Sequence, residues 1–457
     1  MLTKTEVVAM AEDITTSSDS EAIRLEGIAG ALRPGPGSMS VPADAKQEMR
    51  EFAAKSQTNY LPLIVDVFAQ SLQVVGYRGS ESADNLAVWD ELWQPNGMDA
   101  RQAGIIRSSL EYGYGFGVVL PGDPVPVMRG RSARQMRCQW SSLDDVWPRF
   151  ALDLVGPNNR RLLTDEYVYN LVKATGQRGG SDKWVVESVW AHGLGVCPVV
   201  RFRNEIVLDN DMPQGVVEPL IPVQSRIDET VFGLLTAQYF SAFHQRWVTG
   251  WTVPTDPVTG APASMKTSVA KLMAFEDPDV KVGQFAASDL KGYLDSKQSG
   301  VQDLAAIAQV PPQALLGHIS NLSAEALAAT NDGRDRRAGE FKVSLGESFE
   351  QFLRLGAAAA GDVAGAEDES AQVRWMDGSA RSLAQTVDAL GKMSSLLGIP
   401  AEGLWDRIPD TTDQDIEQWK LLKEQEDSLG LLAGVFDEQA TPPPVDDLDQ
   451  PEAAEAF

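Results

Sequence analysis

The 457-residue sequence has little cysteine and no long uninterrupted apolar run. Its two cysteines, Cys138 and Cys197, are too few for a disulfide framework and too far apart for a zinc or redox motif, so we expect two buried thiols. No segment reaches the ~18 consecutive apolar residues that span a bilayer, and the N-terminus lacks the apolar core of a signal peptide. We therefore expect no membrane association and a protein made and kept in a cytoplasm-like compartment.

Basic residues are scarce. The chain has 39 Lys and Arg against 65 Asp and Glu, a net charge of -26. Because proteins that grip nucleic acid carry basic surfaces, tight non-specific DNA binding is disfavoured. The same charge suits a protein past which DNA moves without adhering, since like charges repel and few counterions are released.

Recognisable catalytic motifs are also lacking. Gly113–Gly117 has three alternate glycines, but a strand-like run follows where a dinucleotide fingerprint needs a helix, which favours close backbone packing. Asp209–Asp211 begins like a calcium loop, yet Pro213 occupies a ligand position, and a turn fits better. The adjacent pair Asp144 and Asp145 is typical of a solvated turn. No Walker lysine motif occurs, and we expect no cofactor and no metal.

The three histidines are far apart and lie outside nucleophile and zinc motifs. His244 falls in an aromatic helical stretch, which favours packing over catalysis, and His192 has no motif around it. His318 lies in a loop that ends a helix. An α+β hydrolase or transferase with an unrecognised active site stays open as the alternative function.

At this length roughly two to four domains are expected. Residues 1 to about 40 predict a helix and then a breaker, and Tyr60–Val75 predicts a helix leading into a strand. Glycines, aromatics and β-rich runs alternate from there to about Arg203. This pattern predicts an α+β domain.

The middle of the chain changes character. Two apolar stripes at spacings of three and four predict a long helix from Leu220 to Trp247 that is contacted on two sides. The second contact comes either from the same domain or from a copy of the helix in a ring. The first stripe is Leu220, Val223, Ile227, Val231 and Leu234, and the second is Phe232, Leu235, Tyr239, Phe243 and Trp247.

A compact turn-rich insert then separates this helix from a second one over Ser288–Gln309, which Val310-Pro311-Pro312 must end. A third helix should run from an N-cap at Ser323 to about Leu355, with a bend in its polar centre, Thr330–Glu340.

The C-terminal part is predicted from composition and periodicity. Ala357–Ala371 predicts a loop, Gln372–Met376 a strand, and Ser382–Leu432 interrupted helices. The tail from Asp437 has seven acids and no Lys or Arg, so we expect it to be disordered.

Five segments, in this order, resemble the portal proteins of long-tailed double-stranded DNA phages, and they span most of the folded chain. They are Trp93–Asp99, Leu110–Val119, Cys197–Asn204, Ile307–Gly317 and Ser320–Ala326. The resemblance implies an α+β portal fold, mainly helical, with β-containing wing and clip regions, and a ring of twelve subunits. The implied regions are the wing (1–219 and 323–378), the stem helices (220–249 and 286–310), the clip (250–285), the tunnel loop region (311–322), the crown (379–435) and a disordered acidic tail (436–457).

The resemblance also implies site residues. The tunnel loop lining the DNA channel would be Gly317, His318, Ile319, Ser320, Asn321 and Leu322. Inter-subunit packing in the stem would come from Ile227, Val231, Leu235, Tyr239, Phe243 and Trp247. Transient phosphate contacts would come from Arg246, Lys291 and Lys297, inside a largely acidic lumen.

The implied protein is a non-enzymatic channel at one capsid vertex of the virion, assembled in the host cytoplasm. Its implied partners are further copies of itself, double-stranded DNA, the large terminase, the major capsid and scaffolding proteins, and the head-completion adaptor protein. It would serve DNA packaging, genome retention and ejection.

Overall fold

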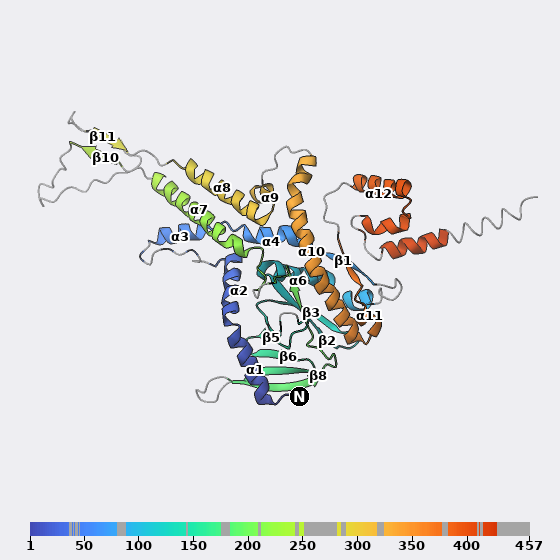
Figure 1. Ribbon diagram of the computed structural model, residues 1–457. Helices are drawn as coiled ribbons and strands as arrows, with labels where there is room; N and C mark the ends of the chain where they lie inside the picture. Colours follow the sequence, from blue (N-terminus) through green and yellow to red (C-terminus); the bar gives the residue numbers. More distant parts are fainter. Residues whose placement is uncertain are drawn as a thin grey trace, which may run out of the picture.

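The computed structural model describes residues 1–35, 39, 41, 44, 46–79, 88–142, 145–174, 183–208, 212–242, 246–250, 281–284, 289–317, 324–376, 383–408, 411 and 415–426. Helices and antiparallel sheets are mixed along the chain, in the order shown in Figure 1. This arrangement confirms the mixed α and β class.

The N-terminal segment forms two helices, α1 (Lys4–Ser17) and α2 (Asp19–Leu32), where one was predicted. Thr3 and Glu6 form a reciprocal capping box that fixes the start of α1. The break at Ser18 lets each helix follow its own partner: α1 lies on a β-sheet, and α2 joins the main core.

The sheet under α1 has five antiparallel strands: β4 (Met136–Gln139), β5 (Phe150–Gly156), β6 (Asn159–Leu163), β7 (Tyr167–Ala174) and β8 (Lys183–Ala191). Val7, Ala11 and Ile14 of α1 share a small core with buried residues of this sheet, such as Leu162 and Tyr169. Figure 1 shows α1 lying along the sheet at the lower end of the molecule.

The main core is built on a three-stranded sheet of order β3-β2-β9, formed by β2 (Tyr114–Leu120), β3 (Val127–Ser132) and β9 (Val199–Arg203). The helices α6 (Met98–Tyr112) and α10 (Ala324–Ala360) cover one face. A β-carbon on Gly117 would lie 2.6 Å from Phe352 Cε2 and 2.8 Å from Phe202 Cε2. The predicted close packing at Gly113–Gly117 is confirmed.

Smaller elements complete this core: α4 (Leu61–Ala69), β1 (Val74–Arg78) and a π-helical turn (Trp89–Trp93). The helix α3 (Gln47–Ser56) lies outside this core and contacts α7 (Ile221–Ala242) instead. The predicted helix and strand over Tyr60–Val75 are therefore confirmed as α4 and β1. β1 pairs antiparallel with β12 (Gln372–Trp375), the strand predicted near the C-terminus. This pairing joins segments about 300 residues apart in the sequence.

A helix pair extends from the core, formed by α7 (Ile221–Ala242) and α8 (Lys291–Ala308). The predicted extension of the first helix to Trp247 is wrong, because Arg246–Thr249 is strand β10 and pairs antiparallel with β11 (Lys281–Gln284). Figure 1 shows this ribbon at the far end of the pair. The rest of the predicted clip, 251–280, lies outside the described residues.

After α8 come the short helix α9 (Pro312–Leu316) and then α10, which is helical without interruption across Thr330–Glu340. The predicted loop over Ala357–Ala371 is wrong in most of its length, since α10 continues to Ala360 and α11 (Val363–Glu367) follows. Its alanines favour helix even though the segment is small and acidic. The C-terminal helices are α12 (Leu383–Leu397), a 3-10 segment (Ala401–Arg407) and a helix over 415–426.

Among the residues that the structure describes, no helix combines the length and apolar character needed to cross a bilayer. Within the same residues, no group of three or more His, Cys, Asp or Glu could hold a metal ion. Both cysteines are free; Cys197 is buried, but Cys138 is only half-buried, which corrects the expectation for that residue.

The structure describes some of the residues that were predicted to form ordinary turns or packing contacts. His192 is buried, and its Nε2 lies 3.0 Å from the carbonyl oxygen of Thr164, with burial lowering its pKa. Asp145 accepts a hydrogen bond from the Ser142 backbone N–H at 2.8 Å, as a turn residue does. Asp144, Asp209–Asp211 and His244 lie outside the described residues.

Candidate functional site

The α7/α8 pair is held together by two glycines, one on each helix. A β-carbon on Gly300 would lie 2.9 Å from Ile227 Cγ1, and one on Gly233 would lie 2.9 Å from Tyr293 Cε1. Residue numbers rise along α7 as they fall along α8, so the helices are antiparallel. Each glycine gives the opposite side chain room against the helix backbone. The pair is therefore closely packed along the length that these two contacts span.

An ion pair extends the same register, since Arg226 Nη2 lies 2.6 Å from Asp303 Oδ2. Both side chains are more than half exposed, so this pair adds little stability. The antiparallel order continues into the ribbon, where Arg246 pairs with Gln284 and Thr249 with Lys281. The helix pair and the ribbon thus share one antiparallel order.

The end of α8 is a fixed turn. Gln309 is the one non-glycine with positive φ (58°) in the described chain, and it caps α8 in the left-handed conformation. The Val310 N–H then donates to the Ala305 carbonyl at 3.0 Å, which closes the helix end. Pro312 begins α9, and Gly317, at φ 66°, ends it. The chain is therefore held tightly up to the point where the predicted tunnel loop starts.

Arg337 of α10 lies beside this turn. Its guanidinium lies 3.5 Å from the carbonyl oxygens of Ile307 and Ala308 and over the rings of Phe68 and Phe341. Burial lowers the pKa of Arg337. A cation at a helix C-terminus offsets the negative end of the helix dipole. The sequence pattern gave no signal for this contact between α10 and α8.

A set of hydrogen bonds fixes the root of α7 to the N-terminal region. Gln224 accepts from Tyr60 N–H at 3.0 Å and donates to the Thr58 carbonyl at 2.8 Å. Asp228 accepts from Thr58 N–H and from Gln224, both at 3.0 Å. Burial raises the pKa of Asp228, and these hydrogen bonds oppose that rise. We call these four residues the α7 clamp.

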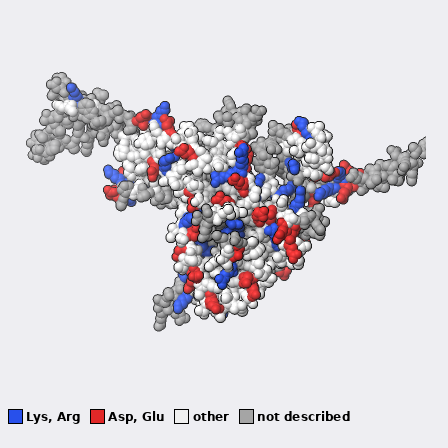
Figure 2. All heavy atoms as spheres, in the orientation of Figure 1, with Lys and Arg blue, Asp and Glu red and all other residues white. Residues whose placement is uncertain are grey.

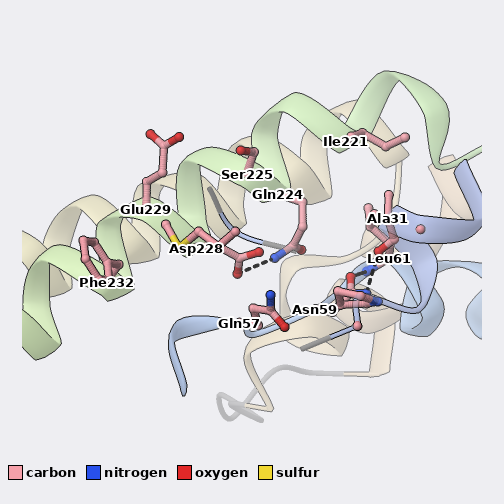
Figure 3. Close-up of a pocket in the computed structure, with 14 residues that line it drawn as sticks. Ala31, Gln57, Asn59, Leu61, Ile221, Gln224, Ser225, Asp228, Glu229 and Phe232 are labelled. Carbon is pink, nitrogen blue, oxygen red and sulfur yellow. Dashed lines mark hydrogen bonds between the residues drawn. The ribbon is translucent and has the colours of Figure 1, made fainter. Parts of the chain in front are cut away.

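Gln224 and Asp228 of the clamp line a cavity of about 760 Å³ between α7, the end of α2 and residues 57–61. Figure 3 shows Asp228 and Gln224 on the α7 side and Asn59 opposite them. Asn59 donates to the Ala31 and Leu32 carbonyls at 2.8 and 2.9 Å, which caps the end of α2. Polar residues at the root of α7 were not singled out from the sequence, because a helical apolar stripe does not reveal bonds to distant backbone.

The residues predicted to pack between subunits differ in how far the single chain already buries them. Ile227 is buried inside the chain by α8, and Val231 and Leu235 are half-buried. Tyr239 is exposed, lies 5.2 Å from the ring of Phe52 on α3, and neighbours the exposed Phe240.

The remaining predicted positions are spread over β10, α8 and the end of α9, or lie outside the described residues. Trp247 lies on β10, and Phe243 is outside the described residues. Arg246 also lies on β10 rather than on a helix, Lys291 is exposed at the start of α8, and Lys297 is half-buried on the stripe of α8 that holds Tyr293 and Gly300. Of the predicted tunnel loop, Gly317 is described, and His318–Leu322 lies outside the described residues.

Charge is unevenly distributed along the sequence. The α7 and α8 helices together contain three basic and four acidic residues, so they are close to neutral. The 97 residues from Gly361 onward contain 22 acidic and 6 basic residues, a net of -16 out of -26. Figure 2 shows both signs interspersed over the face in view. The negative excess therefore lies mainly in the C-terminal fifth of the chain.

The order of these elements has a counterpart among known proteins. The family model described as phage portal protein, SPP1 Gp6-like, matches residues 23–429, which include the helix pair, the turn after it and α10. This chain belongs to that family. Members of the portal family are structural proteins rather than catalysts.

Curated portal relatives come from mycobacterial phages. The portal protein of Mycobacterium phage L5 is 23% identical over 331 residues, which cover 68% of this chain and 66% of the relative. The portal protein of Mycobacterium phage D29 is 24% identical over 325 residues, which cover 66% and 64%. The chain thus spans just under two thirds of the length of these curated portal proteins.

Solved structures resemble this portal chain at low identity. The neck of a native gene transfer agent particle, computed with C12 symmetry, has a TM-score of 0.45 and 12% identity, covering 82% of this chain and 99% of that chain. The neck of an empty particle, computed with C6 symmetry, has a TM-score of 0.42 and 13% identity, with the same shares covered.

Proposed function

We propose that this chain is one subunit of a twelve-membered portal ring, through whose axial channel double-stranded viral DNA is packaged, retained and ejected. The observation that carries the proposal is the family match over residues 23–429. The α7/α8 pair fits the role, because a stiff, narrow projection can stand beside copies of itself around an axis. Its near neutrality leaves DNA without a strong binding surface.

Within this proposal the regions keep the predicted order, with corrected bounds. The stem is α7 and α8, the clip is the segment between them including β10 and β11, and the crown begins at 379. Residues 1–219 and 323–378 form the wing. Residues 317–322 line the channel as the tunnel loop, and Lys291 and Lys297 contact phosphates transiently.

The proposed partners are the large terminase, the major capsid and scaffolding proteins, and the head-completion adaptor, with the subunit in the virion after assembly in the host cytoplasm. No contact in the described residues favours the alternative of a hydrolase or transferase. Negative-stain electron microscopy and native mass spectrometry of the purified chain test the proposal. We expect a ring of about twelve copies with an axial hole; a monomer or small oligomer without a hole would contradict it.

A further inference from the structure

A basic pocket lies between α2, α6 and the turn that joins β3 to β4, apart from the α7/α8 pair. Its volume is about 630 Å³. Four arginines and two glutamates are among its lining residues, namely Arg33, Arg107, Arg134, Arg137, Glu26 and Glu111. A local excess of positive charge is unusual in a chain whose net charge is -26. The pocket therefore favours an anionic occupant.

The arginines converge on one region. Arg33 Nη2 lies 3.7 Å from Glu111 Oε1, and Arg107 and Arg134 also act on this carboxylate. Burial, the largest effect, raises the pKa of Glu111, and the three guanidinium groups each oppose that rise. Three cations, from the residue after α2, from α6 and from the β3–β4 turn, thus act on the Glu111 carboxylate.

The guanidinium groups remain accessible to a further anion. Arg134 Nη2 lies 2.7 Å from Glu26 Oε2, but Glu26 is 71% exposed, and the Arg33 side chain is 72% exposed. Ion pairs this exposed add little stability, so exchanging a glutamate partner for another carboxylate costs little free energy. Arg137 donates from Nη1 to the Ala133 and Met136 carbonyls, and Arg107 pairs with Asp66. Each guanidinium has five N–H donors, so several remain for a carboxylate.

We propose that this pocket binds the chain's own acidic C-terminal segment, residues 437–457. That segment has seven acids and no Lys or Arg. The described chain ends at Glu426, and the 31 residues after it can extend up to about 100 Å, enough to reach across a domain.

A peptide fits this pocket better than a DNA duplex does. A duplex presents closely spaced phosphates along a rigid rod, whereas Glu26 and Glu111 interrupt the positive surface. The strongly negative chain also repels a polyanion of high charge density. An extended peptide carries fewer charges and can place single carboxylates between the two glutamates.

Photocrosslinking in the full-length chain tests the proposal. Benzoylphenylalanine replaces Phe457, the protein is irradiated, and mass spectrometry maps the crosslinked peptides. We expect crosslinks to residues 22–33, 104–112 and 132–137, with the yield falling at least fivefold when Arg134→Gln and Arg137→Gln are combined. Raising NaCl from 0.05 to 0.5 M should lower the yield similarly, since salt screens accessible charges.

Two further variants test the tail separately and provide a control outside the pocket. Asp446→Asn, Asp447→Asn and Asp449→Asn together alter the tail alone and should also lower the yield at least fivefold. Arg149→Gln, an exposed arginine outside this pocket, should leave the yield unchanged. Crosslinks scattered over the surface, or an undiminished yield in the tail variant, would overturn the proposal. So would binding of a labelled DNA duplex that depends on Arg134 and Arg137 while the tail variant crosslinks normally.

Discussion

Ile227 of α7 packs against the open side of Gly300 of α8, where a β-carbon would lie only 2.9 Å from Ile227 Cγ1. Ile227 is 1% exposed and belongs to the main core, from which the pair extends. The contact therefore holds the two helices together within one chain, before any neighbouring copy is considered.

We expect Gly300→Val to destabilise the chain by about 2 kcal/mol, because the added side chain overpacks the helix interface. Gly292→Ala, also on α8, is the matched control, since no atom lies within 4 Å of the added β-carbon. That change should be neutral or stabilise by up to about 1 kcal/mol through helix propensity. Urea unfolding followed by circular dichroism compares the two. Equal effects would show that Gly300 is not a packing site.

Asp228 should make stability depend on pH in a defined direction. Burial raises its pKa above the ordinary 3.8, so the folded chain holds this proton to a higher pH than the unfolded chain does. Its contribution to stability therefore falls as the pH rises from about 3.8 through the raised value. Asp228→Asn, whose amide oxygen can accept from Thr58, should match or exceed the wild type at pH 7.5. That advantage should shrink as the pH falls towards 4.

Urea unfolding at pH 7.5, 5.5 and 4 measures this difference. Asp228→Ala leaves the Thr58 N–H without its acceptor and should cost about 1 kcal/mol at pH 7.5. The cost should be larger at pH 4, where the protonated Asp228 adds stability to the wild type alone. An Asn variant that is less stable than the wild type by the same amount at all three values would contradict the assignment.

Exposed apolar side chains near the far end of the helix pair should matter for assembly. Phe240 and Leu294 are 57% and 54% exposed in the single chain. Phe240→Ser with Leu294→Ser should lower the yield of rings severalfold, because apolar and aromatic side chains at interfaces often carry much of the association energy. Ile23→Ser, at a residue that is 74% exposed on α2, is the control. Light scattering after size-exclusion chromatography measures ring yield, and equal yields would count against the stem assignment.

Residues 317–322 should act on DNA rather than on assembly. Replacing Gly317–Leu322 by a Gly-Ser segment of equal length should leave rings intact, because α9 and α10 keep their separate contacts with the core. Packaging or genome retention should fall, measured as packaged DNA per particle by quantitative PCR in the phage. A variant phage that packages and retains DNA normally would refute the channel role.

Most helices and strands could be predicted from the amino-acid pattern alone. Sequence patterns predicted α4, β1, α8 and the course of α10, and Pro311-Pro312 predicted where α8 must end. The sequence segments around the helix pair also predicted the portal family, which the family match confirmed. These features depend on residues a few positions apart, so the spacing of residue types along the sequence is enough to predict them.

Contacts between residues far apart in the sequence could not be predicted from that pattern. The aromatic stripe to Trp247 reads as helix, but pairing of Arg246–Thr249 with Lys281–Gln284 makes that end a strand. Tertiary packing also placed Ile227 against Gly300 and brought Thr58 to Asp228. It gathered arginines from the end of α2, from α6 and from the β3–β4 turn into one pocket. Such contacts join residues separated by tens to hundreds of positions, and periodicity along the chain carries no information about them.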